Sequence, residues 1–132
     1  MKIVIDTNIF VSSFFWGGHP REVFERVING LDELFITDEI INEITSVMGS
    51  SKFIVSSSEI EDYIKIIKKY SKKIISKNTT ESISRDKSDD KIVQCGLDGD
   101  VDFIVTGDKD LLVLAECETI KIMKPKEYLE IV

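Results

Sequence analysis

Short apolar runs and longer amphipathic stretches alternate along the chain. The short runs are rich in β-branched residues, which is typical of strands buried on both faces of a parallel sheet. They predict strands at residues 3–5, 34–36, 74–75, 102–106 and 119–123. Apolar residues at helical spacing predict helices at residues 8–15, 20–29, 38–48, 58–70, 88–98, 109–115 and 125–131. This alternation predicts a single α/β domain over residues 1–132, with a central, mostly parallel sheet of four to five short strands and helices on both faces.

Several of these elements have recognisable boundaries. Thr37 is placed to cap the helix at residues 38–48, and Gly49 to end it. Ser58 and Glu61 have the spacing of a capping box, which would open the helix at residues 58–70. Residues 77–88 are polar and without apolar periodicity, so we expect a long loop there.

Composition places the chain among ordinary one-domain globular proteins, with 132 residues of which 42% are hydrophobic and 31% charged. Cys95 and Cys117 have neither the spacing of a metal site nor that of a disulfide framework. We therefore expect reduced thiols and a cytoplasmic location. The N-terminal residues lack the pattern of an export signal, and no apolar run approaches the roughly 20 residues that a membrane-spanning helix needs.

The formal net charge of -7, from 24 acidic and 17 basic residues, argues against a protein that grips nucleic acid through a broadly basic surface. It remains compatible with a nuclease. Enzymes that cut phosphodiesters with divalent metals collect carboxylates at the active centre, so their overall charge can be negative. The positions of the acidic residues therefore matter more than their number.

Two aspartates directly follow predicted strands. Asp6 ends the strand at residues 3–5, and Asp108 follows the strand at residues 102–106 after Gly107. Because ligands of open parallel sheets bind beyond the carboxyl ends of the strands, these are favourable places for chemistry.

Glu43 borders the apolar face of its predicted helix, where a charge needs a partner, and a bound cation is one candidate. Asp89 and Asp90 begin a helix, where negative charge is favoured in any protein. Together with Asp6 and Asp108, these carboxylates could hold one or two Mg²⁺ or Mn²⁺ ions, which prefer oxygen ligands. The simpler interpretation makes Asp6 and Asp108 turn residues, Asp90 a helix-start acid and Glu43 a side chain that reaches solvent.

Five motifs occur in order along the chain. They are Ile-Val-Ile-Asp-Thr-Asn at residues 3–8, Trp-Gly-Gly at 16–18, Ile-Ile-Asn-Glu-Ile at 40–44, Asp-Lys-Ser-Asp-Asp-Lys at 86–91, and Phe-Ile-Val-Thr-Gly-Asp-Lys-Asp-Leu-Leu at 103–112. In this combination the chain, from about residue 2 to residue 130, resembles the PIN-domain family, and in particular its branch of toxins from toxin-antitoxin modules.

This resemblance implies an endoribonuclease that depends on Mg²⁺ or Mn²⁺. The implied metal-binding and catalytic acids are Asp6, Glu43, Asp90 and Asp108. For the third acid, Asp89 remains an alternative to Asp90, because Lys87 replaces the proline that the family usually has before this pair.

The resemblance also implies supporting residues and partners. Asn8 and Thr106 match positions that shape the pocket through hydrogen bonds, and Asp110 matches a frequent accessory acid. The expected partners are an RNA substrate, a second copy of the chain in a homodimer, and a cognate antitoxin that occupies the groove near the acidic pocket.

Two other functions compete with this one. A noncatalytic PIN-like module would bind RNA or protein and keep its acids for folding or metal-dependent stability. A phosphoacceptor or phosphatase-like domain would use Asp6 as nucleophile, but it is disfavoured because no second aspartate stands two residues further on.

The remaining distinctive residues have simpler interpretations. We expect Trp16 to pack against the core rather than to stack on a base, and His19 to mark a helix entry rather than to act in catalysis. The lysines at positions 65, 68, 69 and 72 are expected to form a solvated helix face.

Overall fold

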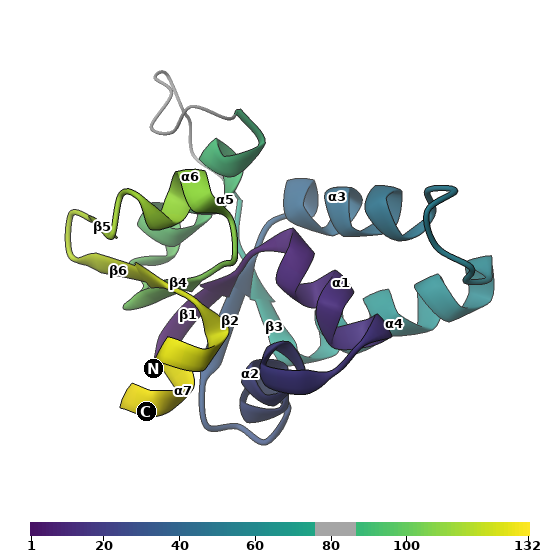
Figure 1. Ribbon diagram of the computed structural model, residues 1–132, viewed down its shortest axis with the longest axis horizontal. Coiled ribbons are helices and arrows are strands. Elements are labelled where there is room, and N and C mark those ends of the chain that lie inside the picture. Colours follow the sequence, from purple (N-terminus) through teal and green to yellow (C-terminus); the bar gives the residue numbers. More distant parts are fainter. Residues whose placement is uncertain (76–86) are drawn as a thin grey trace.

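The protein folds around one sheet, which the computed structural model shows with helices on both of its faces (Figure 1). The structure describes residues 1–75 and 87–132, and for residues 87–90 it describes the backbone only. The strands are β1 (Lys2–Ile5), β2 (Glu33–Ile36), β3 (Ser71–Lys73), β4 (Phe103–Val105), β5 (Glu116–Cys117) and β6 (Ile120–Met123). The helices are α1 (Thr7–Phe15), α2 (Gly18–Ile28), α3 (Asp38–Met48), α4 (Ser57–Tyr70), α5 (Lys87–Gly99), α6 (Lys109–Leu112) and α7 (Pro125–Ile131).

Within the described residues the sheet has six strands in the order β3-β2-β1-β4-β6-β5. All neighbouring strands are parallel except β5 and β6. β1 lies at the centre, where Ile3 pairs with Leu34 of β2 and with Phe103 of β4. The predicted α/β class and mostly parallel sheet are therefore confirmed. The two-residue strand β5 was not expected, and it brings the sheet beyond the four to five strands predicted.

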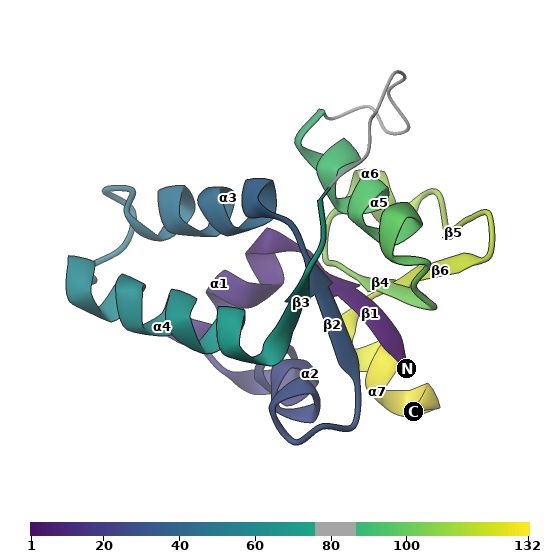
Figure 2. The same ribbon diagram turned by 180° about the vertical axis from the view of Figure 1, so that it is seen from behind.

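Helices pack on both faces of this sheet, as the two opposite views show (Figures 1 and 2). α5 contacts β1, β2 and β4 on one face, while α1, α2 and α7 form a connected group on the other. The close approach of α5 depends on Gly96, because a Cβ atom there would lie 3.1 Å from Ile104 Cδ1 of β4. The side chains of Ile3, Val4 and Ile5 are almost completely buried between these layers.

Capping chemistry explains where two helices begin. The Thr37 hydroxyl accepts a hydrogen bond from the backbone N–H of Ile40, which confirms the predicted start of α3. The N-cap predicted for the next helix was wrong by two residues. Its capping box joins Ser56 and Glu59, not Ser58 and Glu61, and α4 begins at Ser57.

The third strand also differs from the prediction, which placed it at residues 74–75. α4 ends at Tyr70 and β3 follows at once, with Ser71 paired to Leu34 and Lys73 to Ile36. β3 lies at the sheet edge and Lys72 and Lys73 are exposed, so its sequence lacks the apolar pattern of a buried strand.

Near the C-terminus the predicted helix at residues 109–115 is shorter than expected. α6 ends at Leu112, and Ala115 has a φ of 58°, a left-handed conformation that no helix continues through. Glu116 and Cys117 then pair with β6 in an antiparallel hairpin. The loop predicted at residues 77–88 falls almost entirely outside the described residues. In the part of the chain that the structure describes, no helix is long and apolar enough to cross a membrane.

Candidate functional site

Asp6 stands at the carboxyl end of the central strand. It follows β1 directly and occupies the position before the first residue of α1. Its backbone N–H donates to the carbonyl of Val105 at 3.0 Å, which ties it to the end of β4. Only 5% of the residue is exposed. The sheet therefore places a buried carboxyl group where parallel α/β domains bind their ligands.

Thr106 connects the ends of β1 and β4. Its side chain is buried, and its hydroxyl donates to Asp6 Oδ2 at 2.6 Å. The Thr106 hydroxyl oxygen also accepts a hydrogen bond from the backbone N–H of Asp108 at 3.0 Å. One hydroxyl group thus orients the Asp6 carboxylate and holds the turn that bears Asp108. The supporting role that the family resemblance implies for Thr106 stays a prediction.

Asp108 is the second aspartate at this edge of the sheet. It caps the short helix α6, and its Oδ1 accepts the backbone N–H of Asp110 at 2.7 Å. Both residues are half-buried. Capping fixes one oxygen of Asp108 toward the protein backbone, and Asp110 lies within the same turn.

Glu43 reaches this region from α3. The Thr7 hydroxyl donates to Glu43 Oε1, and the Lys91 ammonium donates to Glu43 Oε2 at 3.1 Å. Glu43 therefore has partners within the protein and is not the solvent-directed side chain of the simpler interpretation. Thr7 and Lys91 were not singled out by sequence analysis, although Lys91 stands inside the motif at residues 86–91.

Electrostatics link the three acids. Burial raises the pKa of the Asp6 carboxyl, and the negative charges of Asp108 and Glu43 raise it further. Hydrogen bonds from the Thr106 side chain and the Thr7 backbone act in the opposite direction without cancelling the rise. Asp6, Glu43 and Asp108 thus come from three separate elements to one region of mutual repulsion, which a bound cation would relieve.

The remaining predicted site residues are placed differently. Asn8 is exposed in the first turn of α1. Asp89 and Asp90 begin α5, but their side chains lie outside the described part of the structure, so the choice between them stays a prediction.

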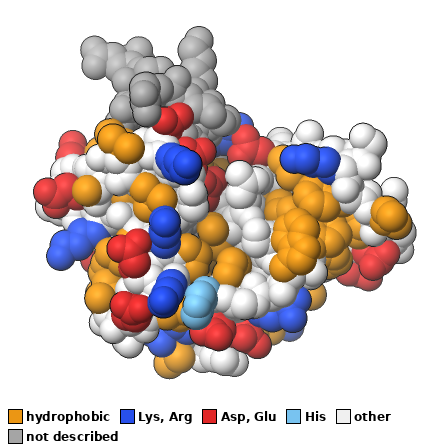
Figure 3. All heavy atoms as spheres, in the orientation of Figure 1, with side chains coloured by type: hydrophobic (Ala, Val, Ile, Leu, Met, Phe, Trp, Pro, Cys, Tyr) orange, Lys and Arg blue, Asp and Glu red, His pale blue; other side chains and the backbone are white. Residues whose placement is uncertain are grey.

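The surface view places acidic side chains in the same region of the molecule. Figure 3 shows them gathered between α6 and the start of α3, where the carboxyl ends of the central strands lie.

The chemistry of these donors fits a hard divalent cation. The side chains that converge here present carboxylate and hydroxyl oxygens, which Mg²⁺ and Mn²⁺ prefer. Among the described residues, however, no group of three or more His, Cys, Asp or Glu side chains is close enough to hold a metal.

Trp16 and His19 lie away from these acids. Trp16 touches the rings of Phe15 and Phe53 but is 70% exposed, so its predicted packing against the core is only partial. Phe15 and Phe53 stack with ring centroids 4.5 Å apart. His19 stands in the first turn of α2 beside Glu22, which agrees with its interpretation as a helix-entry residue.

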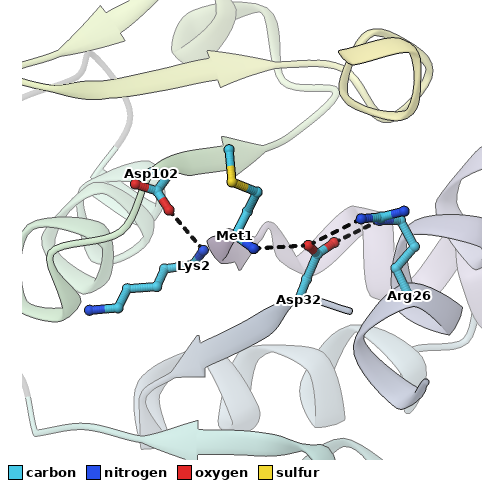
Figure 4. Close-up of polar contacts among 5 residues, drawn as sticks. All are labelled: Met1, Lys2, Arg26, Asp32 and Asp102. Carbon is cyan, nitrogen blue, oxygen red and sulfur yellow. Dashed lines mark hydrogen bonds and ion pairs between the residues drawn. The ribbon is translucent and has the colours of Figure 1, made fainter. Parts of the chain in front are cut away.

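A second polar cluster lies at the opposite, amino-terminal end of the strands (Figure 4). The Asp32 side chain is fully buried and accepts from Arg26 Nε at 2.9 Å and from the Met1 ammonium at 3.2 Å. Burial alone would raise the pKa of the Asp32 carboxyl, but its hydrogen bonds and the positive charge of Arg26 together outweigh burial and hold the pKa below its usual value. Sequence analysis missed this cluster because its members carry no motif.

The fold and the carboxylates at its C-terminal edge define a parallel α/β domain with an acidic site. Residues 2–110 match the family model for the PIN domain, and the chain belongs to that family. A protein of Methanocaldococcus jannaschii described as uncharacterized is 28% identical over 141 aligned residues, which cover 98% of this chain and 90% of that protein.

Among solved structures, the chain is similar to one in the crystal structure of VapBC2 from Rickettsia felis bound to a DNA fragment from their promoter. The TM-score is 0.64, and the match covers 92% of this chain and 97% of the other. Sequence identity is 12%, so the likeness shows a shared fold.

Proposed function

We propose that this chain is an endoribonuclease that requires Mg²⁺ or Mn²⁺ and hydrolyses RNA phosphodiester bonds. The observation that carries the proposal is the buried Asp6 carboxylate at the end of β1, opposed by the charges of Asp108 and Glu43. Membership of the PIN-domain family, whose members are generally nucleases, supports this function.

In this proposal the metal is held by Asp6, Glu43, Asp108 and one aspartate at the start of α5, for which we choose Asp90. When bound, the cation would neutralise the carboxylates, polarise the scissile phosphate and activate a water molecule. The protein's own contribution is orientation. The Thr106 hydroxyl donates to the Asp6 carboxylate and the Thr7 hydroxyl to that of Glu43, and these hydrogen bonds restrict the orientation of both acids before a metal binds.

We further propose that the chain is the toxin of a toxin-antitoxin pair and is silenced by a cognate antitoxin. The motifs that resemble the toxin branch of the family support this role, as does the structural likeness to a chain of VapBC2. Induced expression in a bacterial host should then arrest growth in a manner that depends on Asp6. A small protein encoded by a neighbouring gene should relieve the arrest.

One observation favours a second candidate, a noncatalytic module that binds RNA or protein. The ion pair with Lys91 compensates the charge of Glu43 without any metal. In such a module the carboxylates would serve the fold or metal-dependent stability, and no RNA would be cut.

The experiment that separates the two candidates is cleavage of several end-labelled single-stranded RNAs in Mn²⁺, Mg²⁺ or EDTA. The variants are wild type, Asp6→Asn, and Asp62→Asn as a matched substitution at an exposed position of α4. The ribonuclease proposal expects metal-dependent cleavage by wild type and Asp62→Asn and none by Asp6→Asn. Cleavage that persists in Asp6→Asn would reveal a contaminating nuclease and refute the assignment. If no RNA is cut while Mn²⁺ raises the melting temperature of wild type and Asp62→Asn but not that of Asp6→Asn, the binding module replaces the enzyme.

A further inference from the structure

Lys91 approaches the acidic site from α5. Its ammonium nitrogen lies 3.1 Å from Glu43 Oε2, although the two residues are 48 positions apart. The contact therefore depends on the packing of α5 beside α3 and not on local sequence. The negative charge of Glu43 is one of those that raise the pKa of Asp6. The positive charge of Lys91 therefore lies beside the cluster formed by Asp6, Glu43 and Asp108.

The environment of this ion pair differs from that of the other lysine ion pairs that the structure describes. The side chains of Lys91 and Glu43 are 27% and 23% exposed. In the pair of Lys72 with Glu33, at the same nitrogen–oxygen distance of 3.1 Å, the exposed fractions are 64% and 50%. Solvent screens an exposed pair strongly, whereas a partly buried pair retains much more of its attraction.

Glu43 is also held at its other oxygen. Because Thr7 donates to Oε1 and Lys91 to Oε2, both carboxylate oxygens have protein partners. A metal ion that takes Glu43 as a ligand must approach an oxygen that already accepts a hydrogen bond. On the Oε2 side it must also approach an ammonium group of the same sign.

We propose that Lys91 is a resident counter-cation of the acidic site, which competes with the divalent metal for Glu43 and so sets the metal concentration at which the site fills. This inference rests on the proposed function for the presence of a metal site. Lys91 is a positioning residue in this account: it acts through Glu43 and stabilises the metal-free molecule by compensating one of its clustered charges. When the metal binds, it replaces the Lys91 ammonium as the positive partner of Glu43.

The test is direct binding of Mn²⁺ by isothermal titration calorimetry, with the Mn²⁺-induced rise in melting temperature as a second readout, and no RNA present. Lys91→Met removes the charge and the hydrogen bond to Glu43, while Lys91→Gln removes the charge and keeps a donor. Both should bind Mn²⁺ about tenfold more tightly than wild type, which corresponds to about 1.4 kcal/mol. Their metal-free melting temperatures should be lower than that of wild type.

Two controls make the result specific. Lys91→Arg keeps the charge and should bind Mn²⁺ with an affinity close to that of wild type. Lys72→Met deletes the exposed partner of Glu33 and should change neither affinity nor melting temperature appreciably. Unchanged or weaker Mn²⁺ binding by Lys91→Gln, or equally tight binding by Lys91→Arg and Lys91→Gln, would overturn the proposal, even if Lys91→Met does not fold.

The same titrations separate this inference from the proposed function. If wild type binds Mn²⁺ and the neutral variants bind it no better, only the role of Lys91 fails. If neither wild type nor any Lys91 variant binds Mn²⁺, the metal site itself fails, and both proposals fall together.

Discussion

Asp6 keeps a carboxylate in surroundings that oppose its charge. Burial removes it from water, and Asp108 and Glu43 repel it, so its pKa is raised above the usual value. An acidic group whose pKa is higher in the folded than in the unfolded state destabilises the fold at neutral pH, and that cost is lost as the pH falls through the folded pKa toward the unfolded one. A bound cation would relieve this electrostatic repulsion.

Asp6→Asn should accordingly stabilise the metal-free protein while abolishing cleavage. The amide is neutral at every pH, and its oxygen can still accept the Thr106 hydroxyl. We expect a gain of about 0.5–2 kcal/mol in the free energy of unfolding at pH 7, measured by urea unfolding in EDTA. The gain should shrink as the pH is lowered, because wild-type Asp6 then becomes protonated in the folded state.

The control for this prediction is Asp62→Asn, whose exposed side chain should leave the unfolding free energy nearly unchanged. A strong loss of stability in Asp6→Asn, in EDTA at pH 7, would show that the carboxylate is structural and that its repulsion by the other acids is minor.

Some residues of the candidate site could be predicted from the sequence, and others could not. Asp6 and Asp108 could be chosen because each follows an apolar run, a signal that is local in the chain. The partner of Glu43 could not be chosen in this way, because Lys91 meets it only through the packing of α5 against α3. Charge at a helix border predicts that a partner exists but does not identify it.

Among the secondary-structure elements, α4 provides a direct test of the helix start seen in the structure. Ser56 accepts from the backbone N–H of Glu59 at 3.1 Å, and Glu59 accepts from the backbone N–H of Ser56 at 3.1 Å. Ser56→Ala should therefore lower the free energy of unfolding by about 1 kcal/mol. Ser58→Ala, the matched change at the position expected from sequence, should cost much less. Urea unfolding of both variants compares them directly, and the reverse order would contradict the observed capping box.

Elements with a buried face were predictable, and the polar ones were not. The helix at residues 38–48 was predicted with both ends correct, because Thr37, Gly49 and the apolar stripe between them agree. β3 was misplaced by three residues, since Ile74 and Ile75 attracted the prediction while the edge pairing uses Ser71, Lys72 and Lys73. Edge strands need no apolar pattern, so their positions depend on where the neighbouring strand ends.

At the scale of the whole molecule, the two ends of the sheet respond to acid in opposite ways. At the amino-terminal end, the pKa of Asp32 is lowered by Arg26 and its other partners in spite of burial. A depressed pKa contributes stability above the unfolded value, and that stability is lost as the pH falls through the folded pKa. At the carboxyl-terminal end of the strands the pKa of Asp6 is raised. The charge of Asp6 therefore costs stability at neutral pH, and this cost is lost as the pH falls.

Asp32→Asn should therefore reduce the free energy of unfolding by about 1.5–3 kcal/mol at pH 7, the usual loss for a hydrogen bond to a charged group. The difference from wild type should fall toward zero well below pH 4, where wild-type Asp32 is also neutral. Asp102→Asn is the matched control, since its exposed carboxylate accepts a single hydrogen bond from the Lys2 backbone (Figure 4). Urea unfolding at pH 7 and pH 3 would measure both, and a deficit that persists unchanged at pH 3 would argue against the ionic contribution.

The outer strands of the sheet have a consequence for self-association. β5 has two residues, and β3 has three, of which Lys72 and Lys73 are exposed. Short strands and exposed lysines are devices by which proteins prevent a foreign backbone from adding to a sheet edge. A second copy would thus find little template for strand addition in the described part of the chain. The homodimer that the family resemblance implies should instead be joined through helix surfaces, with the sheet of each subunit remaining separate.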